Sequence, residues 1–508
     1  MSVGDPYYLT TPIYYVNDSP HIGHAYTTVA TDALARFQRL DGRDVMFLTG
    51  TDEHGQKVAK SARDAGVDPQ AFCDRVSQNF RDMGKLMNIS NDDFIRTTEP
   101  RHVKASQAIW QELERSGDIY LGKFAGWYSV RDEAFYDESE LIAGKAPTGA
   151  DVEWVEEDNY FFRLSAWQDR LLEFYERHPD FIAPRARRNE VVSFVAGGLH
   201  DLSISRTSFT WGIPVPGNEK HVMYVWLDAL TNYLTAVGYP DREDAAYKRY
   251  WPADLHMVGK DIVRFHCVYW PAFLMAAGIA PPKRVFAHGW WTVEGQKMSK
   301  SLGNFIPPAQ LVEQYGVDQV RYFMLRELPF GSDGDFSRRA IVNRINGDLA
   351  NDFGNLAQRV LSMIQQYCQG RVPTPGAPSA DDAALLDEAQ GLLAKLRSEF
   401  ADQEFHRALE TIWQVVAAAN RYVDLAAPWA LRRSDPARMA TVLYTLAETI
   451  RHLAVLVQPV VPDAAARLLD QLGQPRDRRN FASLTAHPLE PGTALPKPEG
   501  IFPRLVEA

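Results

Sequence analysis

Residues 7–24 read YYLTTPIYYVNDSPHIGH, and this stretch decides the fold that the sequence predicts. The part from Tyr7 to Tyr15 is rich in tyrosine, threonine and isoleucine, which favours a buried strand. Asn17 to Pro20 has the residue types of a turn, and a helix is expected from His21 to about Leu40. A second apolar strand, Val45 to Leu48, follows. Strands that alternate with helices predict a parallel sheet with helices on both faces.

This alternating pattern is interrupted once and then resumes. From Gly117 to about Gly217 the chain is rich in aromatic residues, glycine and glutamate, which predicts an insertion of β-hairpins with some helix. Strand-like segments return at Val222–Trp226, Leu255–Gly259 and Arg284–Gly289. We therefore expect two halves of one nucleotide-binding, Rossmann-type sheet with a domain inserted between them.

The C-terminal third is expected to be helical, because apolar residues recur at helical spacing from about Arg338 onward. The sequence thus predicts an α/β fold: a Rossmann-type parallel sheet interrupted by an inserted domain and followed by an all-α helix bundle. The predicted domains are residues 1–115 and 218–290 for the two halves of the sheet, 116–217 for the insertion, 291–345 for a connecting region and 346–508 for the bundle with its tail.

Composition excludes several classes of protein. Apolar residues make up 45% and charged residues 23% of the 508 residues, as in ordinary globular proteins. No run of roughly 18 apolar residues marks a membrane span, and the N-terminus has no basic and apolar secretory signal. Cys73, Cys267 and Cys368 lie far apart and form no CxxC pair. We therefore expect reduced thiols in a cytoplasm.

The net charge, 54 minus 65 or −11, by itself favours an enzyme that acts on small molecules over a nucleic-acid binder. A nucleic-acid partner would require local gathering of basic side chains. The candidate clusters are Arg185, Arg187 and Arg188; Arg338, Arg339 and Arg344; and Arg432 with Arg433.

The first chemical signal is His21-Ile22-Gly23-His24, which follows a strand and opens a helix. A helix N-terminus presents free N–H groups and a partial positive charge to an anion. Gly23 lets a nucleotide approach the backbone closely, and both histidines lie in the first turn, where they can donate to phosphate oxygens. Alone, these four residues are equally compatible with two surface histidines beside a glycine.

The second signal is Lys297-Met298-Ser299-Lys300-Ser301, in a polar loop flanked by glycines. Two lysines separated by small hydroxyl residues can clamp a triphosphate and stabilise the charge that develops at a phosphorus under attack. A lysine-serine surface loop is common by itself. The two signals in this order on an interrupted α/β sheet are far more specific than either one.

Together these signals identify a resemblance to the class I aminoacyl-tRNA synthetases, whose signatures HIGH and KMSKS stand intact here. Further blocks resemble the methionyl-tRNA synthetase family over essentially the whole chain. They are Pro12–Asn17, Gly50–Gly55, Trp226–Ala229, Gly259–His266 and Leu328–Phe336. The resemblance implies a ligase that activates methionine with ATP and transfers it to tRNA, and it implies that the helix bundle binds the anticodon.

The resemblance also implies a methionine site. A site for this amino acid needs a carboxylate for the ammonium group and an apolar, aromatic slot for the thioether. Asp52 is expected to take the ammonium group at the carboxyl end of a strand. The slot is expected to consist of Ile13, Tyr15, Trp226, Ala229, Tyr233, Ile262, His266 and Trp270. Without the resemblance, Trp226 and Trp270 would be assigned to the core and His266 to an ordinary helix.

For ATP, the expected ligands are Asn17, Gly23, Gly259, Asp261, Lys297, Ser299 and Lys300, with Mg²⁺ as the counter-ion of the phosphates. His21, His24, Lys297 and Lys300 are expected to stabilise charge on the transferring phosphates. No protein nucleophile is required, and the sequence identifies no general base for transfer to the tRNA.

The inserted domain departs from many relatives, which carry zinc-binding cysteine knuckles. Ser129 and Asp132 stand where a CxxC pair would be, so no structural zinc is expected. Instead, hydrophobic packing of Trp127, Tyr128, Phe135 and Tyr136 is expected to hold the insertion together. Its length of roughly 100 residues also indicates that no separate editing domain is present.

In the helix bundle, the resemblance implies that Asn355, Arg359 and Trp429 recognise the CAU anticodon of tRNA(Met). The aromatic ring would stack on a base while the polar pair binds its edge, which is how unpaired RNA bases are recognised. We expect no C-terminal dimerisation domain after the bundle, and therefore a monomer that has methionine, ATP and tRNA(Met) as partners and no membrane.

Three other functions remain open from the sequence. A nucleotidyltransferase of the same superfamily would not need the helical region. A non-catalytic tRNA-binding paralogue usually loses signature residues, whereas His21, His24, Lys297, Lys300 and Asp52 are all present. A synthetase for another apolar amino acid is the nearest enzymatic alternative, and Trp226 with His266 argues against it.

Overall fold

The computed structural model describes residues 4–16, 19–132, 134–293, 295–297 and 306–505. Its largest sheet consists of β1 (Pro6–Tyr15), β2 (Asp44–Asp52), β3 (Asp93–Arg96), β7 (Ile182–Ala183), β12 (Leu255–Gly259) and β13 (Val285–His288). The strands are parallel in the order β3-β2-β1-β12-β13-β7. This confirms the predicted Rossmann-type sheet, in which the early strands are joined by β12 and β13 from much later in the chain.

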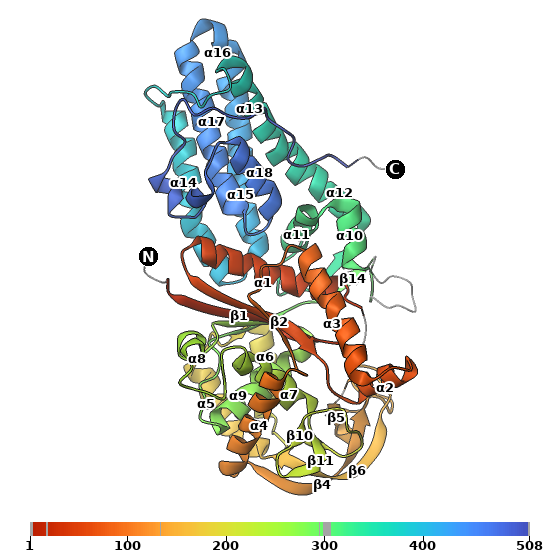
Figure 1. Cartoon of the computed structure of the whole chain (residues 1–508). Coiled ribbons are helices and arrows are strands. Elements are labelled where there is room, and N and C mark those ends of the chain that lie inside the picture. The colour runs from red at the N-terminus through yellow and green to blue at the C-terminus, as the bar shows by residue number, and fades with distance from the viewer. Residues whose placement is uncertain (1–3, 17–18, 133, 294, 298–305, 506–508) are drawn as a thin grey trace.

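Helices cover both faces of this sheet (Figure 1). One face carries α1 (Ile22–Leu40) and α3 (Pro69–Leu86), and the other carries α4 (Pro100–Arg115), α7 (Val225–Thr235) and α9 (Trp270–Ala276). The shorter helices α2 (Gln56–Asp64) and α8 (Ala245–Tyr250) complete this part. Local sequence fixes the helix starts: Asp68 accepts hydrogen bonds from the first N–H groups of α3, and Pro69 occupies its first position.

The inserted region forms its own antiparallel sheet in the order β5-β4-β6-β8, from β4 (Ile119–Ser129), β5 (Ala134–Tyr136), β6 (Glu153–Phe162) and β8 (Leu202–Ser203). It also contains α5 (Gln168–Arg177) and α6 (Arg185–Ala196). A smaller sheet has β9 (Ser205–Arg206), β10 (Pro214–Val215) and β11 (Asn218–Met223). Within the predicted insertion, β7 pairs with β13, so the chain returns to the main sheet before residue 218.

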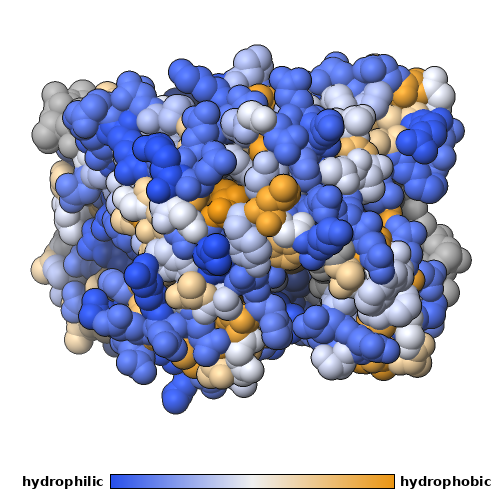
Figure 2. All heavy atoms as spheres, turned by 90° about the horizontal axis from the view of Figure 1, so that it is seen from below, coloured by the Kyte–Doolittle hydropathy of each residue, from blue (hydrophilic) through white to orange (hydrophobic). Residues whose placement is uncertain are grey.

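Figure 2 shows the molecule from the end at which the inserted sheet lies. Hydrophilic residues cover most of this face, and apolar residues form only small groups among them. Such scattered apolar side chains are normal for a protein surface in water.

A third sheet, in the order β15-β14-β16, lies between the main sheet and the helix bundle and consists of β14 (Trp291–Val293), β15 (Gln296–Lys297) and β16 (Gly334–Phe336). With it pack α10 (Pro308–Tyr315), α11 (Val317–Arg326) and α12 (Arg338–Arg344). The bundle comprises α13 (Asn355–Tyr367), α14 (Ala380–Ala401), α15 (Phe405–Ala426), α16 (Pro428–Ser434), α17 (Pro436–Val457), α18 (Pro462–Gln471) and α19 (Ser483–Ala486). Two π-helical segments, Phe265–Tyr269 and Ile345–Gly354, precede α9 and α13.

The helix α17 is long and apolar enough to cross a membrane by length and composition. However, 89% of its most apolar window is buried, since it packs among α14, α15, α16 and α18. Burial of this kind is typical of the central helix of a bundle.

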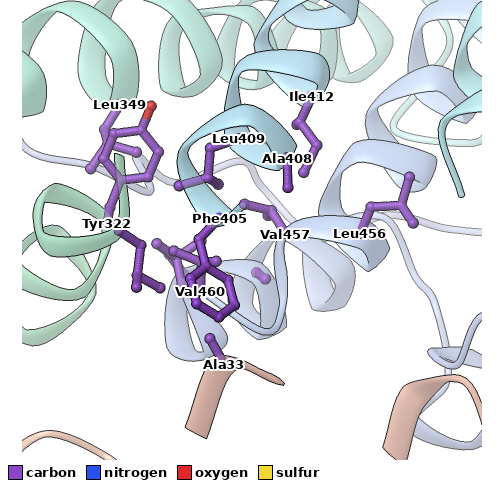
Figure 3. Packing of buried hydrophobic residues seen from close by; sticks show 14 of the residues in the cluster. Ala33, Tyr322, Leu349, Phe405, Ala408, Leu409, Ile412, Leu456, Val457 and Val460 are labelled. Carbon is purple, nitrogen blue, oxygen red and sulfur yellow. The ribbon is translucent and has the colours of Figure 1, made fainter. Parts of the chain in front are cut away.

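One hydrophobic core joins the bundle to the sheet. Figure 3 shows Ala33 of α1 close to Phe405 at the start of α15 and to Val460 just after α17. Tyr322 of α11 packs on the same cluster. The helix α1, whose N-cap is His21, is therefore anchored at its middle by the bundle.

Candidate active site

A cavity of about 570 Å³ lies at the carboxyl ends of β1, β2 and β12, where open α/β sheets bind their ligands. It is bounded by the start of α1, by α7 and by the segment after β12. The predicted site residues that line it are Ile13, Tyr15, His21, Gly23, His24, Asp52, Trp226, Ala229, Tyr233, Gly259, Asp261, Ile262 and His266. Residues that are far apart in the sequence thus meet around one space.

His21 and His24 form a reciprocal cap at the start of α1. Nδ1 of His21 accepts a hydrogen bond from the N–H of Gly23 at 3.0 Å, and Nδ1 of His24 accepts one from the N–H of His21 at 3.1 Å. The two rings stack with their centres 3.9 Å apart. Because each Nδ1 is an acceptor, each neutral ring carries its proton on Nε2 and can donate it to another group.

The electrostatics agree with this protonation state. Burial, together with the neighbouring His21, holds the pKa of His24 well below its ordinary value. His24 is therefore a neutral hydrogen-bond donor at physiological pH. Gly23 leaves room for the ring of His21, since a Cβ at this position would lie 2.9 Å from its Cε1 and the ring would have to shift.

The aromatic side of the cavity is held by a hydrogen-bond chain. Nδ1 of His266 donates to the carbonyl of Ile262 at 3.0 Å, so its Nε2 accepts from the hydroxyl of Tyr233 at 2.7 Å. Burial lowers the pKa of His266 to about 4, which keeps the ring neutral. Trp226 stacks flat on Phe265, with ring centres 3.7 Å apart. The wall is thus apolar and aromatic with one polar pair.

Asp52 ends β2 opposite Tyr15 of β1, and its carbonyl accepts from the N–H of Val16 at 3.1 Å. The side chain is buried and faces the cavity. The carboxylate thus borders the same space as the residues carried by α7 and by the segment after β12.

A second network borders the cavity at β12. Oδ1 of Asp261 accepts from the indole N–H of Trp290 at 3.1 Å, and a Cβ on Gly259 would lie 2.4 Å from that oxygen. Lys260 lies over the ring of Trp290 and forms an ion pair with Asp333 at 2.6 Å. Asp333 belongs to one of the sequence blocks noted above, and it supports the wall without lining it.

Some lining residues were not anticipated from the sequence. Thr27 of α1 and His288 of β13 are joined by a 2.7 Å hydrogen bond, and both face the cavity. A single threonine or histidine gives no local signal of such a role. Lys57, Asn232, Trp290 and four residues of the insertion, Arg131, Asp132, Tyr136 and Thr148, line it as well.

These insertion residues form a hydrogen-bonded group around Asp132. The N–H of Asp132 donates to Oγ of Ser129 at 3.2 Å, and its carboxylate accepts from the hydroxyls of Tyr136 and Thr148. Arg131 donates to the carbonyl and hydroxyl of Thr148 at 2.8 and 2.9 Å. In the chain as described, no three His, Cys, Asp or Glu side chains gather as metal ligands would.

The predicted packing of the insertion is visible in part. Trp127 meets Trp154 edge to face at 5.4 Å, and the buried ring of Tyr128 lies 5.5 Å from the guanidinium group of Arg206. The side chain of Phe135 lies outside the described part. Hydrogen bonds around Asp132 thus add to the hydrophobic packing that the sequence predicts.

Several predicted residues are not placed at the cavity. Asn17, Ser299 and Lys300 lie outside the described residues, and Lys297 is described only as a backbone position of β15, opposite Thr292. Trp270 is fully buried behind Tyr233, with ring centres 6.2 Å apart, and does not line the cavity.

Two helices of the bundle, α13 and α16, carry the predicted anticodon residues, and α16 lies at the tip (Figure 1). Asn355 and Arg359 are one turn apart on α13, and the guanidinium group of Arg359 lies 6.0 Å from the ring centre of Trp429 on α16. Arg359 also pairs with Asp424 at 2.9 Å. The side chain of Trp429 is 44% exposed, which is unusual for a tryptophan in a helical domain.

Family models match nearly the whole chain. The model described as "tRNA synthetases class I (M)" matches residues 7–152 and 139–361. The model described as "Anticodon binding domain of methionyl tRNA ligase" matches residues 372–508. The first match contains the cavity, and the second contains Trp429.

Individual relatives belong to the same family as these models. Methionine–tRNA ligase of Brucella suis is 60% identical over 99% of this chain and 99% of its own length, and that of Mycobacterium bovis is 57% identical over 98% of both. The structure of Mycobacterium tuberculosis methionyl-tRNA synthetase in complex with methionyl-adenylate superposes with a TM-score of 0.97 at 57% identity, covering 98% of this chain and 100% of that one. The chain belongs to the methionyl-tRNA synthetases, the class I, ATP-dependent ligases that attach methionine to tRNA.

Proposed function

We propose that the cavity binds methionine and ATP side by side and catalyses formation of methionyl-adenylate. The observation that carries this proposal is that one space joins the histidine pair of α1 to Asp52 and to the aromatic wall of Tyr233 and His266. A phosphate-binding group and an amino-acid site thus lie within reach of each other, as a reaction between the two substrates requires.

Asp52 is the proposed partner of the methionine ammonium group, since it is the carboxylate at the end of β2. The side chain then extends toward Ala229, Tyr233 and His266, where an apolar slot suits a flexible thioether. The neutral His266 suits this slot better than a cation, because a charged ring would carry a desolvation cost there. Ile13, Tyr15, Trp226 and Ile262 complete the proposed slot, with Trp270 behind Tyr233.

ATP is proposed to lie across the start of α1, with its ribose near Gly259 and Asp261. It enters as a magnesium complex, in which phosphate oxygens and water hold most of the coordination sites. Nε2–H groups of His21 and His24 point away from the backbone bonds that fix their rings, so they can donate to the phosphates. Gly23, Asn17, Lys297, Ser299 and Lys300 are proposed to contact ATP as well.

In the first step, an oxygen of the methionine carboxylate attacks the α-phosphorus, the bond to the bridging oxygen breaks, and pyrophosphate leaves. In the second, a ribose hydroxyl of the terminal adenosine of tRNA attacks the activated carbonyl, and AMP leaves. The protein contributes positioning and charge stabilisation, and no covalent intermediate with the chain is needed. Discrimination against an amino acid one methylene shorter is limited to about 1–3 kcal/mol.

The tip of the bundle is the proposed anticodon site, with Trp429 stacking on a base and Asn355 and Arg359 binding base edges.

We also propose a cytoplasmic monomer with no structural zinc. All three cysteines are free thiols, and Cys73 and Cys267 are buried, which suits a reducing compartment. Light scattering of the purified protein tests the monomer, and elemental analysis tests the absence of zinc.

Amino-acid-dependent exchange between ATP and pyrophosphate, run with each of the twenty amino acids and no added zinc, tests the site assignment. We expect exchange with methionine alone and a loss of that exchange in Asp52→Ala. Full exchange in Asp52→Ala would remove Asp52 from the site, and exchange with another amino acid would discard the proposed slot.

A further inference from the structure

Behind the cavity lies a buried cluster of two histidines and one carboxylate that the proposed mechanism does not use. Oδ2 of Asp228 lies 2.6 Å from Nδ1 of His54, and Oδ1 lies 2.7 Å from Nε2 of His102. Asp228 and His102 are fully buried, and the side chain of His54 is 8% exposed. None of the three lines the cavity.

The carboxylate of Asp228 is the centre of this cluster. Burial alone would raise its pKa, but the adjacent His54 and His102 outweigh burial, so the pKa of Asp228 is lowered below its ordinary value. A buried ionised carboxylate gains most from short bonds to both of its oxygens, and losing either bond leaves charge without compensation. The cluster therefore resists separation of the elements that it joins.

Those elements are the ones that carry the two halves of the methionine site. His54 lies two residues after Asp52, in the segment that follows β2. Asp228 lies on α7 between Trp226 and Ala229. His102 lies on α4, which packs along α7 and provides a fixed support. The bond between His54 and Asp228 thus connects the segment of Asp52 directly to the helix of the slot.

The other side of His54 is closed by Trp211. The ring centres lie 5.5 Å apart, edge to face. The indole N–H of Trp211 donates to the carbonyl of Glu53 at 2.7 Å, and the N–H of Gly55 donates to the carbonyl of Trp211 at 3.0 Å. The segment 53–55 is therefore held from two sides, by Trp211 and by Asp228.

We propose that His54 and Asp228 are positioning residues for methionine, which set the distance between the carboxylate of Asp52 and the slot on α7. This inference rests on the proposed assignment of Asp52 to the ammonium group. The affinity of a ligand that contacts both Asp52 and the slot depends on that distance. The affinity of a ligand that contacts the slot alone does not depend on it.

The test compares two ligands: methionine and 4-(methylthio)butanoate, which keeps the thioether and the carboxylate but lacks the amino group. Calorimetry gives the ratio of their dissociation constants. Asp52→Asn defines the ratio when the ammonium contact is lost. His54→Leu and Asp228→Asn are expected to shift the ratio toward that value by at least about tenfold, as for loss of a buried bond to a charged group.

Two variants act as controls. His54→Asn keeps a donor near the position of Nδ1, so it is expected to restore the ratio to within about threefold of the unmodified protein. Thr235 lies on α7, as Asp228 does, and Thr235→Val removes its 3.1 Å contact with Nδ1 of His102 on α4 without touching the segment of Asp52. It is expected to leave the ratio within about twofold of the unmodified protein.

Kinetics supply a second readout. In methionine-dependent exchange, KM for methionine is expected to rise in His54→Leu and Asp228→Asn while KM for ATP stays unchanged. If either variant does not fold, Trp211→Phe provides a milder change on the same segment, with an expected shift in the ratio of about two- to tenfold.

An unchanged ratio in the folded variants, or equal weakening of both ligands, would overturn the positioning role. An Asp52→Asn protein that keeps the original ratio would instead overturn the assignment of Asp52, so the two failures can be told apart.

Discussion

The hydroxyl of Tyr233 and Nε2 of His266 lie 2.7 Å apart in the wall of the cavity, and the hydrogen bond runs from tyrosine to histidine. The direction follows from the other ring nitrogen, which donates to the carbonyl of Ile262. The pair therefore presents a fixed, neutral surface to whatever occupies the slot.

Tyr233→Phe removes the hydroxyl of Tyr233, so Nε2 of His266 loses the hydrogen bond that it accepts from this hydroxyl. We expect KM for methionine to rise roughly tenfold, as for loss of one partner of a buried hydrogen bond, while KM for ATP stays unchanged. Exchange kinetics at varied methionine and ATP measure both. An unchanged KM for methionine would place the thioether elsewhere.

The same histidine predicts how stability depends on pH. Its pKa is about 4 in the folded chain, against an ordinary value of 6.5. Between these values the unfolded chain binds a proton that the folded chain does not, so acidification favours unfolding. The contribution of His266 is complete above about pH 6.5 and falls by up to about 3 kcal/mol toward pH 4.

Urea denaturation from pH 7.5 to 4.5 measures this loss. Burial also lowers the pKa values of His24, His256 and His288, so the total slope is expected to exceed that of one proton. In His266→Gln the slope between pH 6.5 and 4.5 is expected to be smaller. An identical slope in that variant would contradict the assigned protonation state.

Gly23→Ala is expected to reduce kcat for methionine-dependent exchange by at least about tenfold, because the new Cβ would displace the ring of His21 from its place in the cap. Methionine binding, measured by calorimetry, should stay unchanged.

Gly84→Ala on α3 is the matched control for that change, since a Cβ there meets no atom within 4 Å. It is expected to keep full activity and to gain about 0.5–1 kcal/mol of stability from helix propensity. Equal activity of both variants would show that the ring of His21 is not needed in its present position.

These cases show what the sequence could predict. His21, Gly23 and His24 form a local pattern whose geometry follows from the first turn of a helix, so their arrangement could be inferred. Asp52 could be placed because carboxyl ends of parallel strands share one edge. The residues of the slot came from the family resemblance, and periodicity alone would have assigned them to the core.

The other residues that line the cavity could not be predicted, because their positions depend on contacts between segments that are far apart in the sequence. Arg131 and Thr148 reach the cavity because the inserted sheet lies beside it, and Thr27 meets His288 across 261 positions of the chain. The sequence also does not distinguish a residue that lines a cavity from one just behind it. The family resemblance implies that Trp270 belongs to the slot, whereas the structure has it buried against Tyr233.

Arg321 predicts a large effect on stability. Its side chain and that of Asp32 on α1 are both fully buried and lie 2.7 Å apart, and Arg321 also donates to the carbonyl of Val460 at 2.9 Å. Arg321→Met removes the fully buried partner of Asp32, which then keeps its bonds to Ser90 and to the partly exposed Arg36. It also removes the bonds of Arg321 to the bundle, so it is expected to cost about 3–5 kcal/mol in urea denaturation. The partly exposed Arg36, which pairs with the same Asp32, provides the control: Arg36→Ala is expected to cost about 1 kcal/mol or less. A loss below that of Arg36→Ala would show that Arg321 does not hold α1 to the bundle.

The last prediction concerns Trp429, an exposed residue of α16, the helix that lies at the tip of the bundle and away from the main sheet (Figure 1). Stacking on an unpaired base contributes about 1–3 kcal/mol, so Trp429→Ala is expected to raise KM for tRNA(Met) about 5- to 150-fold in aminoacylation. Exchange of ATP with pyrophosphate needs no tRNA and should keep its normal rate in the same variant. Trp429→Phe retains a stacking surface and should recover most of the loss. A normal KM for tRNA in Trp429→Ala would move the anticodon site away from this tip, and a reduced exchange rate would show that the substitution disturbs the fold rather than tRNA binding.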